Sequence, residues 1–134
     1  MNGCGLCGEV SGDVVYRDEV ASVVVHPDWS VLGHVMIVAR AHVQNPSELE
    51  AIEWERFARL WHRVEGVLLQ LTGAERAIAM KLGIATPHLH VHLYPVSASA
   101  TRSDVFAAID ENTRVPRDEE FVAALRAHLT AQSD

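Results

Sequence analysis

The sequence lacks the features of several common classes of protein. No apolar run approaches the roughly 20 residues that a membrane-spanning helix needs, and the first residues, MNGCGLCGEV, contain neither the basic nor the apolar region of a signal peptide. Basic residues are the minority, because 11 Lys and Arg face 18 Asp and Glu, for a net charge of −7. A sequence-independent nucleic-acid binder needs a basic surface. We therefore expect a cytoplasmic protein that binds neither nucleic acid nor a membrane.

Cysteine is scarce as well, with only Cys4 and Cys7 in the chain. In a reducing compartment two cysteines more often form a metal site or a redox pair than a structural disulfide. A redox dithiol normally follows a strand and begins a helix, and CGLC at residue 4 does neither. A metal site and a pair of free thiols on a mobile leader both stay open at this point.

The 134 residues are enough for one domain with a real core. Apolar residues make up 49% and charged residues 22%, which is typical of a globular protein. We expect a single domain over residues 1–134, with a Cys-x-x-Cys leader at residues 1–12 and a C-terminal extension at residues 97–134.

The hydrophobic pattern alternates between strand and helix periods. Strands are predicted at residues 14–17, 21–26, 33–40, 77–82 and 88–94. Residues 45–73 keep one helical face apolar, with a capping box formed by Ser47 and Glu50 and a stop at Gly73. Two shorter helices are predicted at residues 103–109 and 118–129. This order predicts an α+β fold, an antiparallel five-stranded sheet covered by one long helix, with a shorter helical C-terminal tail.

Three of the eight histidines stand at alternate positions in the stretch TPHLHVHLYPV, residues 86–96. In a strand, alternate residues point to one face, so His88, His90 and His92 are predicted to form a line. Leu89, Val91 and Leu93 would face the core. A strand face that is only exposed to solvent needs polar residues but not imidazoles in particular. Imidazoles suit chemistry near neutral pH. The row either grips a metal ion or provides a nucleophile with neighbours that donate hydrogen bonds to a phosphate.

The pattern His-φ-His-φ-His-φ-φ, where φ is apolar, resembles the signature of the histidine triad (HIT) family, and HLHVHLYP matches it. LGHVMIVARAHV is similar to the family's Pro-Gly-His segment, and CGLCGEVSGDVVYRDE is similar to its Cys-φ-φ-Cys opening and first strand. The segments keep the family's order, and the long predicted helix falls between the second and the third. The resemblance extends to about Pro95.

The resemblance implies a hydrolase or transferase that acts at the phosphorus of a nucleotidyl compound, of the nucleotide phosphoramidase or dinucleoside polyphosphate hydrolase type. The middle histidine, His90, would attack phosphorus and carry a covalent nucleotidyl group that water then releases. His92 would donate to phosphate oxygens or to the leaving group, and His34 would lie beside the triad. The substrate would be a small phosphorylated compound, a purine nucleotide derivative, and the protein a homodimer.

The resemblance also implies structural zinc, because family members with an N-terminal Cys-x-x-Cys hold it with both cysteines and two histidines. The matching residues are Cys4, Cys7, His42 and His88. Two thiolates and two imidazoles suit a closed tetrahedral site, and no cofactor is required for catalysis. His88 is thus a candidate for both metal binding and substrate binding.

The chain departs from the family pattern where the nucleoside would be held. The segment before the triad, MKLGIATP at residues 80–87, contains no Gln or Asn, and His26 stands where the family places Asp or Asn for the ribose. Arg40 and Ala41 replace the usual Pro-Lys-x, and Val96 replaces a common basic residue. His26 can still bond a ribose, since imidazole donates and accepts. Alternatively the pocket takes another phosphorylated compound.

Three other functions stay open at this point. The protein could be a non-catalytic member that binds a nucleotide or a protein partner. It could be a metal-dependent hydrolase whose strand histidines hold the ion, although no acidic ligand stands close to the triad. It could also be a thiol-redox module. His62 and His128 are expected to be ordinary surface residues, and Trp54 and Trp61 core or interface anchors.

Overall fold

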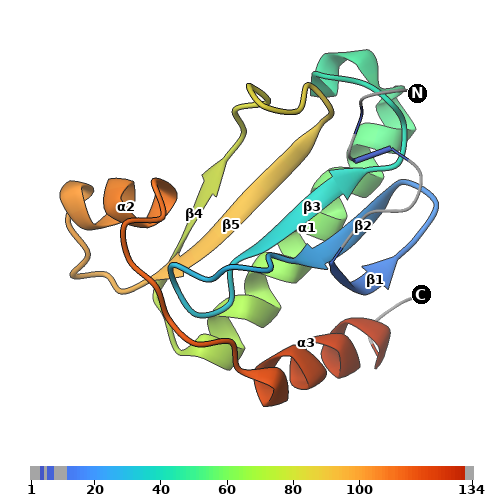
Figure 1. The fold of residues 1–134 in the computed structure, drawn as a ribbon. Helices are drawn as coiled ribbons and strands as arrows, with labels where there is room; N and C mark the ends of the chain where they lie inside the picture. Colours follow the sequence, from blue (N-terminus) through green and yellow to red (C-terminus); the bar gives the residue numbers. More distant parts are fainter. Residues whose placement is uncertain (1–3, 5, 8–11, 132–134) are drawn as a thin grey trace.

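The computed structural model describes Cys4, Leu6, Cys7 and residues 12–131. It contains the five-stranded antiparallel sheet expected from the sequence, one long helix and two shorter helices (Figure 1). The strands are β1 (Asp13–Arg17), β2 (Ala21–Val25), β3 (Val35–Ala39), β4 (Arg76–Met80) and β5 (His90–Val96). The helices are η1 (Pro46–Glu48), α1 (Ala51–Thr72), α2 (Arg102–Ile109) and α3 (Glu119–Ala131).

The strand order across the sheet is β1-β2-β3-β5-β4, and every neighbouring pair is antiparallel. β2, β3 and β5 therefore form its centre. All five residues of β2, ASVVV, are buried. Ala21, Val23 and Val25 belong to the main core, and Val24 belongs to a smaller cluster on the other face. The predicted α+β class is confirmed.

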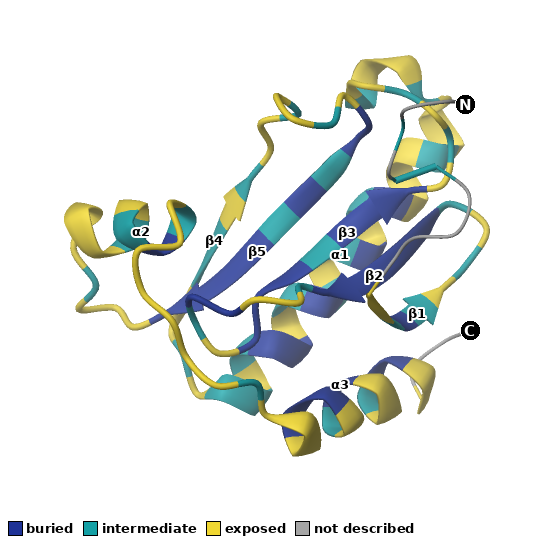
Figure 2. Ribbon diagram, viewed as in Figure 1, coloured by how far each residue is buried: buried dark blue, intermediate teal, exposed yellow. Residues whose placement is uncertain are grey.

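One face of the sheet packs against α1 and α3. The long helix buries Phe57, Leu60, Val64, Val67 and Leu68 along one side, as expected for an amphipathic helix that supplies one half of a core. Figure 2 shows this division, with the buried side of α1 turned toward the sheet and its far side exposed. Leu89, Val91 and Leu93 belong to the same core cluster, as the alternating pattern predicted.

The C-terminal extension contributes to this core. α3 buries Phe121, Val122, Leu125 and Leu129, all of which belong to the cluster that contains α1. Trp61 packs against the cluster as a partly buried side chain, whereas Trp54 is 37% exposed. None of the described helices is both long enough and apolar enough to cross a membrane.

The opposite face of the sheet carries a smaller apolar cluster. Val24 and Val38 are buried there, and Leu6 of the leader packs against them with Val14 and Met36. Met36 pairs with His92 across β3 and β5, and Val38 pairs with His90. The same face therefore holds the leader and the strand histidines, separated by the sheet from α1.

The predicted start of the long helix is wrong. Residues 46–48 form a separate short 3₁₀ helix, and α1 begins at Ala51, because Leu49 is extended and packs against the core. The capping boxes are Asn45 with Glu48 and Glu50 with Glu53, not Ser47 with Glu50. The predicted stop is confirmed, since Gly73 takes the left-handed conformation that favours glycine.

Candidate active site and metal centre

The strand register brings three rings side by side at one end of the sheet. Val35 pairs with Val25 on β2 and with Leu93 on β5, so the residues one step further, His26, His34 and Tyr94, fall in one lateral row. The backbone N–H of His26 donates to the carbonyl of His34 at 3.1 Å. The alternation of strand side chains turns all three rings to the face that carries His90 and His92.

The three rings form a stack. His34 lies between the other two, with ring centroids 4.3 Å from His26 and 4.1 Å from Tyr94 and interplanar angles of 15° and 24°. His34 is buried, only 2% exposed, whereas His26 is half-buried. His26 Nδ1 lies 2.7 Å from the carbonyl oxygen of Asp28. The predicted neighbours His26, His34 and His92 thus do come together.

His34 and His92 share a hydrogen bond that indicates their tautomers. Nε2 of His34 lies 2.8 Å from Nδ1 of His92, while Nδ1 of His34 is buried and has no hydrogen-bond partner. A buried N–H without a partner is rarer than a buried acceptor without one. We therefore assign the proton to Nε2 of His34, which donates to Nδ1 of His92. A neutral His92 then carries its own proton on Nε2.

Both rings are held neutral near pH 7. Burial lowers the pKa of His34 to about 2, and the nearby His26 and His92 lower it in the same direction. Burial is also the main reason that the pKa of His92 is lowered to about 4, and the nearby His90 and His26 lower it in the same direction. Near pH 7 His92 is therefore a neutral hydrogen-bond donor.

These shifts predict a loss of stability in mild acid. The folded pKa values lie below the ordinary value of 6.5, so between pH 6.5 and 4 the unfolded chain binds protons that the folded chain does not. Stability conferred by these two rings is thus present above pH 6.5 and lost as the pH falls. Between pH 6 and 5 each ring should lower the free energy of unfolding by about 1 kcal/mol.

The check is urea unfolding of the native chain and of His34→Phe at pH 7, 6 and 5, with a chelator in every sample so that metal release adds nothing. We expect the variant, which keeps a ring in the stack, to show the shallower pH dependence. If the free energy of unfolding changed equally with pH in the two proteins, the assignment of His34 as a neutral buried imidazole would be contradicted.

His90 has a defined tautomer as well. Its Nδ1 lies 2.7 Å from the carbonyl oxygen of His88, and a carbonyl only accepts, so Nδ1 carries the proton and donates. Nε2 of the neutral ring therefore has the free electron pair. The ring is half-buried and lies beside His92, with centroids 5.2 Å apart.

His88 is not part of the strand row. β5 begins at His90 and ends at Val96, which corrects the predicted strand over residues 88–94. His88 is buried, with 1% of its surface exposed. Nε2 of His88 donates to the carbonyl of Ala39 at 2.6 Å. This bond leaves Nδ1 as an acceptor that faces the leader.

Four predicted metal ligands meet at this position. Their ligand atoms, from Cys4, Cys7, His42 and His88, all lie within 4.8 Å of one another. In the part of the chain that the structure describes, this is the one such group of three or more metal-binding side chains. The His90 and His92 rings are not in it, which weighs against a metal held by the strand histidines.

The spacing of the four atoms fits a tetrahedral zinc ion. Zinc–ligand distances of 2.0–2.3 Å place two nitrogens roughly 3.3 Å apart and a sulfur and a nitrogen roughly 3.6 Å apart. His42 Nδ1 and His88 Nδ1 are 3.3 Å apart, and both Sγ atoms lie 3.4 Å from His88 Nδ1. Cys7 Sγ and His42 Nδ1 are closer, at 2.8 Å. The bond from His88 to Ala39 is the kind of outer contact that orients a metal-bound imidazole.

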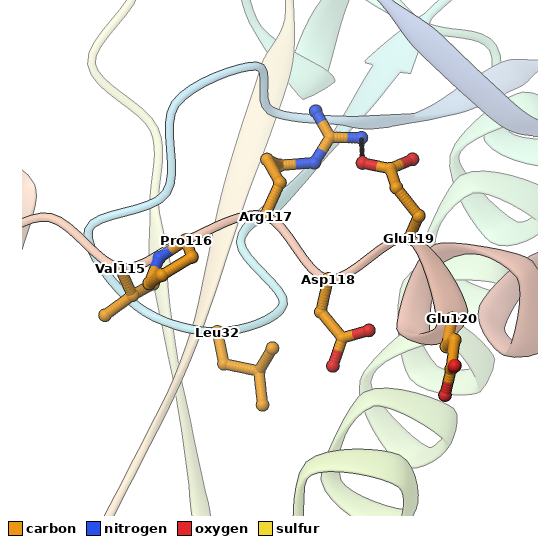
Figure 3. A pocket seen from close by; sticks show the side chains of 7 residues that line it. All are labelled: Leu32, Val115, Pro116, Arg117, Asp118, Glu119 and Glu120. Carbon is orange, nitrogen blue, oxygen red and sulfur yellow. Dashed lines mark ion pairs between the residues drawn. The ribbon is translucent and has the colours of Figure 1, made fainter.

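Two hollows in the described part of the chain lie away from the histidines. One hollow of about 520 Å³ is lined by Leu32 and residues 115–120. Figure 3 shows Arg117 in it turned toward Glu119, with Asp118 directed the other way. No histidine lines this hollow.

Comparison with known proteins identifies the family. The HIT domain model matches residues 7–98. The chain belongs to the HIT family. The matched HIT region begins at Cys7 and includes the sheet, α1 and the histidine row; α2 and α3 lie beyond it. Family membership supports a nucleotide-related hydrolase or transferase at the level of the family.

Solved HIT structures share this fold at low sequence identity. A histidine triad protein from Bradyrhizobium japonicum is 20% identical, with a TM-score of 0.73 over 87% of this chain and 89% of that one. A histidine triad protein from Marinobacter aquaeolei is 19% identical, with a TM-score of 0.69 over 89% and 86%. A zinc-bound family protein from Mycobacterium smegmatis is 18% identical, with a TM-score of 0.64 over 90% and 86%.

Sequence reasoning missed one side chain of the HIT site. Tyr94 stacks on His34 and lies 5.9 Å from the ring of His92. The strand alternation that joined His90 to His92 also placed Tyr94 on this face, so the signal was present. The two carbonyls that fix His88 and His90 have no sequence signal, because every residue carries one.

Proposed function

We propose that this HIT protein hydrolyses or transfers a nucleotidyl group at phosphorus through a covalent intermediate on His90. The observation that carries the proposal is the hydrogen bond from His90 Nδ1 to the carbonyl of His88, at 2.7 Å. This bond turns Nδ1 toward the His88 carbonyl, so the free electron pair of Nε2 is directed away from that carbonyl. A neutral imidazole with a free Nε2 is nucleophilic at pH 7.

In the first step Nε2 of His90 forms a bond to phosphorus, and the bond from phosphorus to the leaving group breaks. The phosphorylated ring carries positive charge, and its Nδ1–H then makes a charge-assisted hydrogen bond to the His88 carbonyl. Water subsequently attacks the same phosphorus and loses a proton to solvent, the nitrogen–phosphorus bond breaks, and His90 recovers its electron pair. No metal ion takes part in these steps.

His92 is the proposed donor to the reacting phosphate or the leaving group, through Nε2–H. His34 fixes this tautomer by donating to Nδ1 of His92 at 2.8 Å, so it is a positioning residue. Such preorganised donors stabilise charge that develops in the transition state. His26, half-buried beside His34 and tied to Asp28, is proposed to contact the substrate.

Cys4, Cys7, His42 and His88 are proposed to hold a structural zinc ion, which would tie the leader to the sheet. Both ring nitrogens of His88 are directed at protein groups, so we propose the metal role for His88 and not substrate binding. A cytoplasmic homodimer whose substrate is a purine nucleotide derivative stays a prediction.

The test is incubation of the purified protein with adenosine phosphoramidates and dinucleoside polyphosphates. Product release and intact protein mass are followed in the same samples, because fast turnover can prevent the adduct from accumulating. We expect product, and in quenched samples an acid-labile mass increase equal to one nucleotidyl group. Binding without product or adduct would instead favour a non-catalytic nucleotide-binding protein.

A further inference from the structure

A second hollow lies on the other side of the sheet from the histidines. It has a volume of about 480 Å³ and lies between the β1–β2 turn and α1, which are neighbours in Figure 1. Its lining includes Tyr16, Val20 and Leu60, which belong to or pack against the core beneath α1. The histidine row is on the opposite face, so this hollow is separate from the proposed active site.

Three arginines of α1 line the hollow: Arg56, Arg59 and Arg63. The chain has only 11 basic residues and a net charge of −7, so three cations in one hollow are a local exception. Their spacing of three and four residues places them on one flank of the helix, over about 10 Å of its length. Guanidinium groups bind phosphate through paired hydrogen bonds.

The two carboxylates at the rim, Asp18 and Glu19, offset part of this charge, and the lining stays positive overall. Oδ1 of Asp18 accepts from the backbone N–H groups of Val20 and Ala21 at 2.8 and 2.9 Å, so the carboxylate caps its own turn. Glu19 lies 3.4 Å from Arg56, but their side chains are 87% and 55% exposed. A pair exposed to that extent contributes little to stability, and a ligand with several negative charges can displace Glu19.

Contacts within the protein hold parts of the hollow in place before a ligand binds. The guanidinium carbon of Arg63 lies 4.6 Å from the centre of the Tyr16 ring, a cation–π contact that restricts the arginine before any ligand arrives. Arg40 donates to the carbonyl of Asp18 at 3.0 Å and holds the β1–β2 turn in place. A preorganised site loses less entropy on binding.

We propose that this hollow binds a chain of two or more condensed phosphates. Three cations spread along about 10 Å of helix suit an extended anion better than a single phosphate group, which could reach only part of the row. The phosphate chain can belong to an inorganic polyphosphate or to a nucleotide. This inference does not depend on the proposed chemistry of His90.

The experiment is a titration of the isotopically labelled full-length protein with sodium tripolyphosphate, followed by amide NMR shifts. Shifts are expected in residues 16–20 and 56–63, together with a dissociation constant that rises with salt. Arg59→Gln should weaken binding about tenfold, and Glu19→Gln should strengthen it several-fold. Both replaced side chains are exposed, so the fold and the basal turnover should be retained.

Arg102→Gln is the matched control, because Arg102 is an exposed arginine on α2 that packs over Phe106. Arg102→Gln should bind tripolyphosphate like the native chain. If tripolyphosphate also removes a bound metal, that effect would be the same in Arg59→Gln and in Arg102→Gln. Equal affinity in Arg59→Gln and the native chain, or shifts confined to the histidine face, would overturn the proposal. Equal binding of inorganic monophosphate would overturn the preference for a phosphate chain.

The source of the phosphate chain is decided by a parallel titration with ATP. If ATP and tripolyphosphate bind with similar constants and shift the same amides, the site recognises the phosphates alone. If ATP binds this hollow much more tightly, the nucleoside adds contacts and a nucleotide is the ligand. Both results support the site, and a failure of both ligands to shift these amides contradicts it.

Discussion

Replacing His90 by alanine is expected to abolish turnover of a nucleotidyl substrate and the covalent adduct together. The only proposed nucleophile is then absent, while the hydrogen bond between His34 and His92 remains. Removing a nucleophile from an enzyme of this kind lowers the rate by at least about 10⁴-fold. The measurement is product release under saturating substrate, combined with intact mass of acid-quenched and alkaline-quenched samples.

His62→Ala is the matched control for this variant, since His62 is an exposed histidine on the far side of the sheet. It should keep native turnover and the native adduct. Because His90 is half-buried, thermal unfolding of both variants must show that they are folded. An adduct that survives in His90→Ala would assign the nucleophile to another residue.

The second large effect is expected from the double substitution Cys4→Ser, Cys7→Ser. Zinc content should fall from about one ion per chain to almost none, because two of the four proposed ligands lose their thiolates. Metal that binds only the folded state stabilises it by about 4 kcal/mol at a thousandfold excess over its dissociation constant. For a domain of this size the melting temperature should therefore fall by roughly 15 °C.

The chemical step should be affected far less than the stability. The His88 carbonyl that orients His90 is held by two bonds that need no metal: Nε2 of His88 to Ala39, and the His88 N–H to the carbonyl of Thr86 at 2.8 Å. At a temperature where the double variant is folded, turnover should therefore stay close to that of the native chain. A chelator should destabilise the native chain and leave the double variant unchanged. An identical melting temperature for zinc-loaded, chelated and doubly substituted protein would argue against a structural ion.

The sequence was a good guide wherever a residue's neighbours along the chain decide its conformation. The alternating apolar residues predicted the strands, and the helical stripe with Gly73 predicted the body and end of α1. The start of α1 was mispredicted because a tertiary contact decides it. Leu49 packs against the core in an extended conformation, and that separates η1 from α1 although both segments favour a helix.

The site shows the same division. The row of His90 and His92 follows from strand alternation, whereas the place of His88 depends on where β5 begins. The stack of His26, His34 and Tyr94 depends on which residues pair across β2, β3 and β5. Pairing register between distant strands is set by the whole core, so spacing within any one segment could not reveal it.

The stack has a consequence for how the binding surface can adapt. Its rings project from β5 and from residues next to β2 and β3, so their positions are as rigid as the sheet. A slip of one residue in any of these strands would turn a ring into the core. New substrate preferences are therefore more easily acquired through segments outside the sheet. Such segments include the turn after His26 and, toward His90, residues 81–87, where Leu82 and Ile84 are exposed. The sheet would supply an invariant reactive surface, and these loops the adaptable rim around it.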